Sequence, residues 1–153
     1  MVLRNCYPPD IRVSNEAQSL SRAGYKVTII CYRKPGEKRT EKIDDVIVKR
    51  IASPFIKKVN YFLVHLIHID VSFFLALRQE VKNNFQAVHV HDLPLLNTVL
   101  LSRFNKKVKL IADLHENYPA AIESWYQPNS FIHRLLRPII FNKDVWTERE
   151  KQV

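Results

Sequence analysis

The chain has 153 residues, of which 46% are hydrophobic and 25% are charged, and its formal net charge is +9. This length and composition suit one globular domain with a core, and they exclude a disordered, collagen-like or low-complexity chain. Gly occurs at only 2 positions, which argues against a site built on a glycine-rich phosphate loop.

A strand–helix–strand unit opens the sequence. Residues 2–6 predict a short strand, residues 12–24 a helix and residues 25–32 a second strand. In the helix, apolar side chains recur on one face at the 3.6-residue period, and Gly24 follows the last of them as a helix-ending residue. Strand, helix, glycine and strand within about 30 residues indicate a βαβ unit.

The rest of the chain continues to alternate strands and helices. The expected elements are a strand over 45–52, a helix over 57–85, a strand over 86–92, a helix over 93–104, a strand over 106–113, a helix over 131–141 and a helical tail over 144–153. Five strands alternating with helices predict an α/β fold: a Rossmann-like parallel sheet with helices on both faces. In such sheets the ligand crevice lies outside the carboxyl ends of the strands.

Residues 59–77 raise the question of a membrane span, because they include a single formal charge over 19 residues. That charge, Asp70, lies near the middle, where a carboxylate costs about 2.5–3.5 kcal/mol on insertion. A buried helix fits this pattern better than a span. A helix lying on the membrane surface beside Lys57 and Lys58 is the second interpretation.

The positive charge is concentrated in patches, of which the longest is the loop-like segment 32–42. Basic patches attract anionic surfaces, and an anionic membrane is the functional interpretation, with solvated loops as the alternative. No patch interleaves aromatic and basic residues on one element, so we expect no nucleic-acid partner. Cys6 and Cys31 match no zinc motif or disulfide framework, and we expect buried thiols in a reducing compartment. No apolar signal-peptide core opens the chain, so a cytoplasmic location is expected.

Polar side chains gather where the strand over 106–113 ends. Asp113, His115 and Glu116 follow one another there. An imidazole titrates near neutral pH, and a neighbouring carboxylate can orient it or accept a proton from a substrate hydroxyl. Glu116 could instead cap the next helix and Asp113 could hold the turn. Asp92 ends the preceding strand in the same way, where a helix cap and a ligand contact are both open.

Two further groups have alternatives that the sequence leaves open. Arg12 at the start of the first helix can reach an anionic group held there, or it can pair with Asp10 or Glu16. His89 and His91 are two apart on a strand and therefore point the same way. They could form a metal pair or be ordinary polar residues at a strand end, and we expect no metal site.

Three segments in order resemble the amino-terminal domain of GT-B glycosyltransferases, specifically the large retaining family 4. They are YPPDIRVSNEAQSLSRAGYKVTIIC, AVHVHDLPLL and LIADLHENYP. The resemblance implies two Rossmann-like domains facing each other across a cleft. The amino-terminal one mainly holds the acceptor, and the carboxy-terminal one holds a nucleotide-sugar through a Glu-x7-Glu motif. It also implies that no metal or cofactor is bound, and that the enzyme lies on the cytoplasmic membrane face.

The resemblance also implies roles for single residues. His115 matches the loop histidine that reaches the transferred sugar, and Glu116 supports it, so these two are the expected catalytic residues. Asp113 and Asn117 would touch the acceptor. Arg12 would lie near the donor phosphates or the acceptor, and Asp92 is expected at the cleft wall as a substrate-binding residue.

The expected function is transfer of a sugar from a nucleotide-diphosphate sugar to an acceptor hydroxyl with retention, in bacterial-type cell-surface glycan synthesis. Residues 1–153 are interpreted as an incomplete acceptor-side domain without its donor domain, inactive alone. Expected partners are the donor through the missing domain, a glycan or lipid-linked acceptor, an anionic membrane surface on the inner face of the plasma membrane, and another chain at an open sheet edge. The alternatives are a subunit of a split transferase and a flavodoxin-like binding domain.

Overall fold

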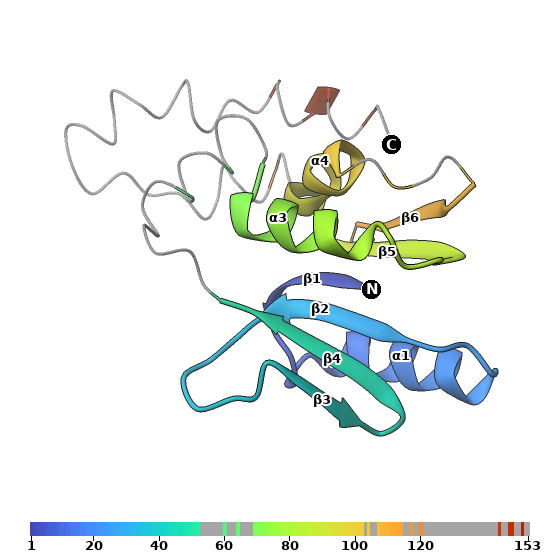
Figure 1. Ribbon diagram of the computed structural model, residues 1–153. Helices are drawn as coiled ribbons and strands as arrows, with labels where there is room; N and C mark the ends of the chain where they lie inside the picture. The colour runs from blue at the N-terminus through green and yellow to red at the C-terminus, as the bar shows by residue number, and fades with distance from the viewer. Residues whose placement is uncertain are drawn as a thin grey trace.

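The computed structural model describes three continuous stretches of the chain, residues 1–52, 69–102 and 107–114. It also describes single positions, at 60, 64, 104, 117, 120, 144, 147, 148 and 151. Within these residues one mixed sheet is covered by helices on both of its faces (Figure 1). The prediction of an α/β, Rossmann-like fold is therefore confirmed.

The sheet contains six strands in the spatial order β3-β4-β2-β1-β5-β6. Their bounds are β1 Val2–Cys6, β2 Thr28–Tyr32, β3 Thr40–Ile43, β4 Val46–Ile51, β5 Ala87–His91 and β6 Lys109–Asp113. All neighbouring pairs are parallel except β3 and β4. All the strands expected from the sequence are present, and β3 is additional.

The additional strand corrects the expectation that segment 32–42 is all loop. β3 runs antiparallel to β4 and joins it through Asp44 and Asp45, whose φ values are 45° and 65°. Positive φ at both central residues is the geometry of a two-residue hairpin turn, and Asp tolerates it. The sequence signal was weak because β3 is a short edge strand with only partly buried residues on its inner side.

Helix α1 (Ile11–Arg22) covers one face of the sheet. The Asp10 side chain caps its start by accepting hydrogen bonds from the amides of Arg12 and Val13, and Gly24 follows its end at a φ of 90°. Val13 and Ala17 are its buried residues. They belong to a core cluster with strands β1, β2 and β4: Leu3, Tyr7, Val13, Ala17, Val27, Ile29, Cys31, Val46 and Val48.

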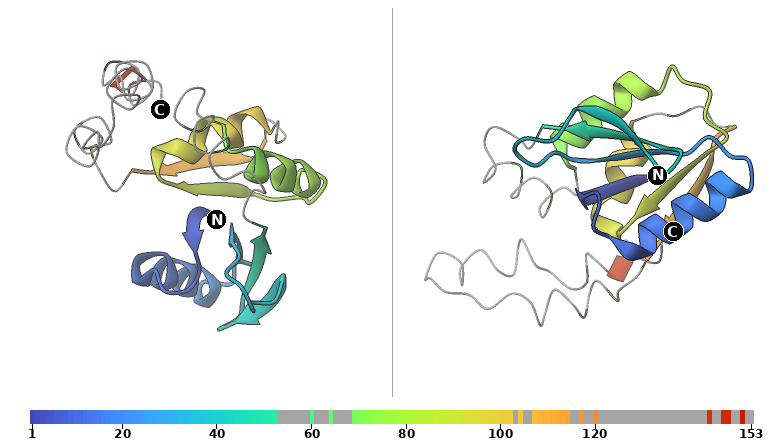
Figure 2. Two further views of the ribbon diagram at one scale, coloured as in Figure 1. Left: turned by 90° about the vertical axis from the view of Figure 1, so that its left-hand side faces the viewer. Right: turned by 90° about the horizontal axis from the view of Figure 1, so that it is seen from below.

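Helices α3 (Val71–Glu80) and α4 (Leu93–Leu101) cover the opposite face (Figure 2). Phe73 packs edge-to-face on Tyr32 of β2, with ring centroids 4.9 Å apart. The second core cluster contains Val2, Ile30, Phe73, Leu77, Val88, Val90, Leu95 and Val99. Because β5 alternates, Val88 and Val90 face this cluster while its two histidines face the side of α1.

The single helix expected over 57–85 is wrong. Ile69 and Asp70 are not helical, and α3 begins only after them. The buried Asp70 carboxylate breaks the helix by capping α3: Oδ1 accepts from the amide of Phe73 at 3.2 Å. The apolar spacing of the sequence is the same whether one helix continues through residue 70 or a new helix begins after it. Only the buried capping contact of Asp70 distinguishes the two cases.

Across the described parts of the chain, no helix is both long enough and apolar enough to cross a membrane. Most of the segment 59–77 lies outside those parts. The helix expected over 131–141 also lies outside them, as does most of the tail.

The expectation of buried thiols holds for Cys31, which is fully buried, but Cys6 is partly exposed. Both are free cysteines. Cys31 lies in the core beneath α1, and desolvation raises the pKa of its thiol to about 11. The reactive thiolate is therefore scarce at Cys31 near neutral pH.

Removing the Asp70 carboxylate should destabilise the fold strongly. Asp70→Ala removes the cap of α3 and leaves several buried donors without their acceptor, so we expect a loss of about 3 kcal/mol in the free energy of unfolding. Urea-induced unfolding followed by circular dichroism measures it. The control, Asp45→Asn at the exposed hairpin turn, should change little. An equally mild effect of both variants would contradict the central role of Asp70.

The two thiols should differ in reactivity. Iodoacetamide at pH 8 should alkylate Cys6 much faster than Cys31, because Cys31 is buried and its raised pKa keeps the thiol protonated. Peptide mass spectrometry of the native protein at successive times gives both rates. Unfolded protein serves as the control, in which the two rates should converge; equal rates in the native protein would refute the expectation.

Candidate functional site

The carboxyl ends of the five mutually parallel strands lie at one edge of the sheet, here called the carboxyl edge. The loop after β1, the loop after β2, the start of α4 and Leu114 after β6 lie there. This is where α/β sheets of this kind hold ligands. The expected site residues at Arg12, Asp92 and Asp113 all lie at or next to this edge.

Arg50 organises two of these loops. Its guanidinium is almost completely buried, and Nη2 and Nε donate to the backbone carbonyl oxygen of Tyr7 at 3.0 and 3.3 Å. The same group pairs with Glu41 at 2.5 Å and with Glu37 at 3.3 Å. Because a buried cation needs carboxylate and carbonyl partners, Arg50 holds the loop after β1 against the loop between β2 and β3.

Arg12 pairs with Asp10, one of the two partners that the sequence left open. Its Nη2 lies 3.4 Å from Oδ2 of Asp10, and the side chain is more than half exposed. Burial opposes ionisation of Asp10, but the amides of Val13 and Arg12 and the Arg12 guanidinium outweigh it and lower the pKa of that carboxyl group. Arg12 thus supports the helix start while its guanidinium remains accessible from solvent.

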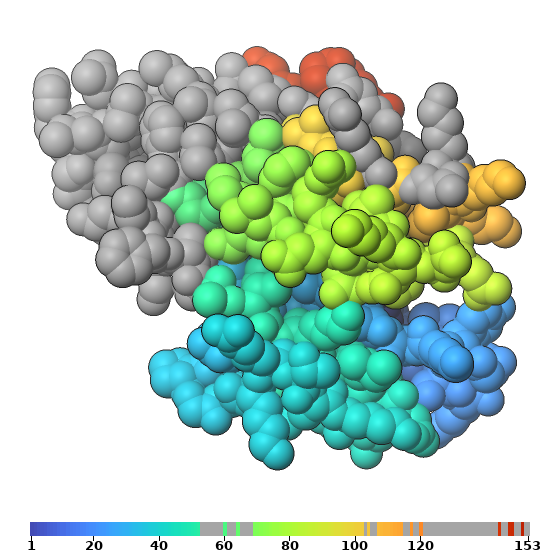
Figure 3. Space-filling model, in the orientation of Figure 1, coloured from blue at the N-terminus to red at the C-terminus, as the bar shows by residue number. Residues whose placement is uncertain are grey.

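The exposed basic residues of the loop after β2 lie beside this edge. Lys34, Lys38 and Arg39 are exposed there, whereas Glu37 turns inward to accept from the amide of Lys34 at 2.7 Å. The loop projects into solvent, away from the two core clusters (Figure 3). It is an exposed cationic surface of the kind that attracts phosphate groups.

Four ionisable side chains come together under the carboxyl edge. His89 and His91 point the same way, as expected, with ring centroids 4.4 Å apart. Oε2 of Glu16 lies 3.8 Å from Nδ1 of His89 and 3.7 Å from Nε2 of His91. On the other side, Oδ2 of Asp113 lies 3.4 Å from Nδ1 of His91 and 3.9 Å from Nε2 of His89.

Sequence reasoning found Asp113 and the histidine pair but missed Glu16 as their partner. Asp113 is beside His91 because the two are paired across β5 and β6. Glu16 follows the buried Val13 by one helical turn on α1, and its contacts with His89 and His91 place it beside the sheet. In the sequence alone, Glu16 could equally be a solvent-exposed charge on the helix surface. Only the packing of α1 on the sheet shows that it faces the histidine pair.

The other expected site residues are Asp92, Asn117, His115 and Glu116. Asp92 begins α4 at a φ of 71°, but its side chain makes no capping hydrogen bond. Oδ1 of Asn117 accepts from the amide of Ala120 at 3.0 Å, so this expected substrate-binding residue also holds a turn. His115 and Glu116, the expected catalytic pair, lie outside the described residues.

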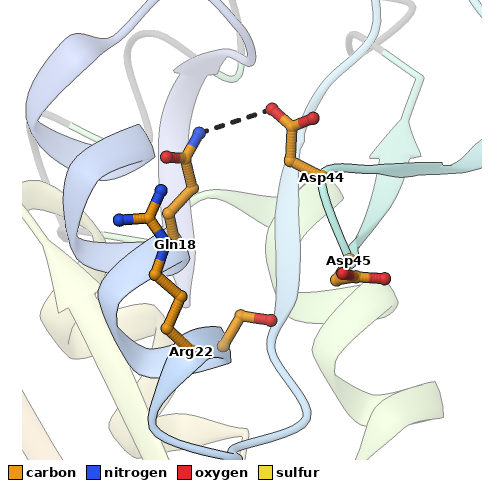
Figure 4. Close-up of a pocket in the computed structure, with 5 residues that line it drawn as sticks. Gln18, Arg22, Asp44 and Asp45 are labelled. Atoms are coloured by element: carbon orange, nitrogen blue, oxygen red, sulfur yellow. Dashed lines mark hydrogen bonds between the residues drawn. The ribbon is translucent and has the colours of Figure 1, made fainter.

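A polar depression of about 460 Å³ lies at the opposite edge of the sheet. Its lining comes from α1 and the β3–β4 turn: Gln18, Ser21, Arg22, Asp44 and Asp45. Nε2 of Gln18 donates to Oδ2 of Asp44 at 3.3 Å across it (Figure 4). Since it is at the amino-terminal end of β4, it is separate from the carboxyl edge.

Comparison with protein families decides the affiliation. A family model described as Glycosyltransferase Family 4 matches residues 11–143. The chain belongs to glycosyltransferase family 4. The match includes α1, the sheet strands after β1 and the segment after β6, so the GT-B amino-terminal resemblance is confirmed over most of this family 4 domain. Searches of curated proteins and of solved structures each found no match.

Removing Arg50 should loosen the carboxyl edge of the family 4 domain. Arg50→Met should cost about 3 kcal/mol of unfolding free energy, because Glu41 and the carbonyl oxygen of Tyr7 lose a buried partner. Hydrogen exchange measured by mass spectrometry should speed up at residues 7–10 and 37–41. The matched control is Arg39→Met at an exposed position. Unchanged exchange in both loops would show that Arg50 does not hold them.

Proposed function

We propose that this domain holds the acceptor of a glycosyltransferase that moves a sugar from a nucleotide-diphosphate sugar to an acceptor hydroxyl with retention. The family 4 match over residues 11–143 carries the proposal. The arrangement of polar groups at the carboxyl edge supports it, since ligands of such sheets bind there. In this proposal the donor is held by a second domain, on the same chain or on a partner.

The charge distribution favours an anionic acceptor. Lys34, Lys38 and Arg39 are exposed in the loop after β2, and Arg12 is exposed at the start of α1. Cationic side chains can hold the phosphate of a lipid-linked or phosphorylated glycan. The same surface suits anionic lipids, which leads to the proposal of a cytoplasmic enzyme at the inner face of the plasma membrane, in bacterial-type glycan synthesis.

The proposed chemistry assigns distinct tasks to the edge residues. His115 contacts the transferred sugar, and Glu116 orients its imidazole. Asp113, Asp92 and Asn117 contact acceptor hydroxyl groups. Positive groups facing the leaving nucleotide diphosphate would stabilise the charge that develops on it in the transition state. The transfer step as proposed uses no cofactor.

A second candidate function is the acceptor-binding subunit of a split transferase. Strand β6 favours it, because among the described residues it is the last strand of the sheet and it exposes Leu110 and Ile111 at 40% and 48%. An exposed apolar edge strand is a template for pairing with another chain. The partner in this case would carry the donor domain.

Turnover with a panel of nucleotide-diphosphate sugars tests the function, using the enzyme that carries this domain and vesicles with a lipid-linked disaccharide acceptor. His115→Ala should lower kcat about 100-fold or more, whereas the control His133→Ala should not. Nuclear magnetic resonance of the new glycosidic bond reports retention.

Each outcome separates the candidates. Near-normal turnover of His115→Ala removes that residue from the mechanism, and an inverted anomeric centre contradicts retention. Acceptor binding without turnover, restored by adding a separate donor-domain chain, supports the split transferase. Absence of both turnover and acceptor binding overturns the proposal.

A further inference from the structure

The cluster of Glu16, His89, His91 and Asp113 has the composition of a metal site. One ligand atom from each of the four side chains can be chosen so that all lie within 4.8 Å of one another. They come from three separate elements, α1, β5 and β6. The proposed sugar transfer uses Asp113 but gives no task to the other three.

The separations in the cluster are longer than hydrogen bonds and close to the spacing of ligands around one ion. The four imidazole–carboxylate distances are between 3.4 and 3.9 Å. Glu16 and Asp113 face opposite nitrogens of each imidazole, so an ion would take one nitrogen from each ring. Hydrogen bonds between such groups measure about 2.7–3.2 Å. Two ligands that each lie about 2.0–2.2 Å from a tetrahedral zinc ion are about 3.3–3.6 Å apart.

Burial of the cluster also favours an ion. Oε2 of Glu16 is buried and has no hydrogen-bond partner among the described residues. His91 is almost fully buried, at 1% side-chain exposure, and its imidazole stacks on that of His89 with the ring planes 31° apart. A buried carboxylate oxygen normally has a partner, and an ion in the cluster would be one for Glu16.

The donor set selects the class of ion. Two imidazole nitrogens and two carboxylate oxygens suit Zn²⁺ and similar transition ions. Mg²⁺ and Ca²⁺ prefer oxygen ligands throughout. The side chains of Glu16 and Asp113 are 36% and 26% exposed, so an ion can enter from solvent on that side. Bringing all four atoms to zinc distance requires side-chain movements of about 1 Å.

We propose that Glu16, His89, His91 and Asp113 bind one zinc-type divalent ion that ties α1 to β5 and β6 beneath the carboxyl edge. The ion has a structural role and shares only Asp113 with the proposed acceptor contacts, so the site goes beyond the proposed function. A four-ligand site made only of protein groups is characteristic of structural rather than catalytic zinc. By cross-linking α1 to two strands, the ion would also fix the position of Asp113 at the edge.

Zinc titration of the full chain after treatment with EDTA tests the site. Isothermal titration calorimetry should show one Zn²⁺ per chain, and Mg²⁺ and Ca²⁺ should not compete. Saturating Zn²⁺ should raise Tm by about 4 °C or more, since an ion that binds only the folded state stabilises it. These measurements need neither sugar nor acceptor, so they succeed or fail independently of the transferase assay.

Three variants locate the ion. Glu16→Gln and His89→Asn each remove one ligand group and keep a polar side chain, and each should weaken zinc binding at least 10-fold. Asp45→Asn also removes one carboxylate but lies at the exposed hairpin turn, and it should bind zinc as the unmodified chain does. Circular dichroism checks that all three remain folded.

X-ray absorption at the zinc edge excludes binding elsewhere. The site predicts nitrogen and oxygen ligands only, with two imidazoles. Sulfur ligation would place the ion at a cysteine and overturn the proposal. Absence of one-to-one binding would also overturn it, as would unchanged affinity in both Glu16→Gln and His89→Asn.

Discussion

The buried carboxylate of Asp70 is the group on which one half of the sheet and its covering helices depend. Its Oδ2 accepts from the hydroxyl of Tyr32 at 2.5 Å and from Nδ2 of Asn60 at 3.1 Å, and it lies 3.5 Å from Nε of Arg4. Its own amide donates to Oγ1 of Thr98 on α4. A fully buried charge must be compensated, so β1, β2, α3 and α4 are held in one arrangement around it.

Arg50 has the matching role on the side of the sheet that α1 covers. Its guanidinium contacts the Tyr7 carbonyl oxygen, Glu37 and Glu41, which come from the loop after β1, the loop after β2 and strand β3. The two buried charges are of opposite sign and lie near the ends of β2 and β4. The loops at the carboxyl edge are thus ordered by buried electrostatic contacts rather than by their own backbone propensity.

Much of the fold followed from local pattern. Six elements were predictable from the sequence: the strands β1, β2, β4, β5 and β6 and the helix α1. Their apolar periodicity indicates which side chains are buried, and Gly24 marks the end of α1. Two features were not predictable. The edge strand β3 has few buried residues to reveal it, and the helix break at Asp70 depends on partners more than 25 residues away in the chain, such as Thr98 and Tyr32. The same holds for the candidate site. Asp113 and Arg12 could be predicted because they lie at the ends of elements, whereas Glu16 could not, because in the sequence it resembles any surface charge on a helix.

The sequence by itself determined the fold class, the family and the edge of the sheet where polar groups collect, because hydrophobic period and motif order are local properties of the chain. Only the tertiary structure decided which polar groups meet. Glu16 is 73 residues from His89 in the chain (89 minus 16), and Asp113 follows His91 by 22 (113 minus 91). Strand register and the packing of α1 bring them within 3.9 Å. Contacts of that kind depend on how elements pack, which no local pattern of residues encodes.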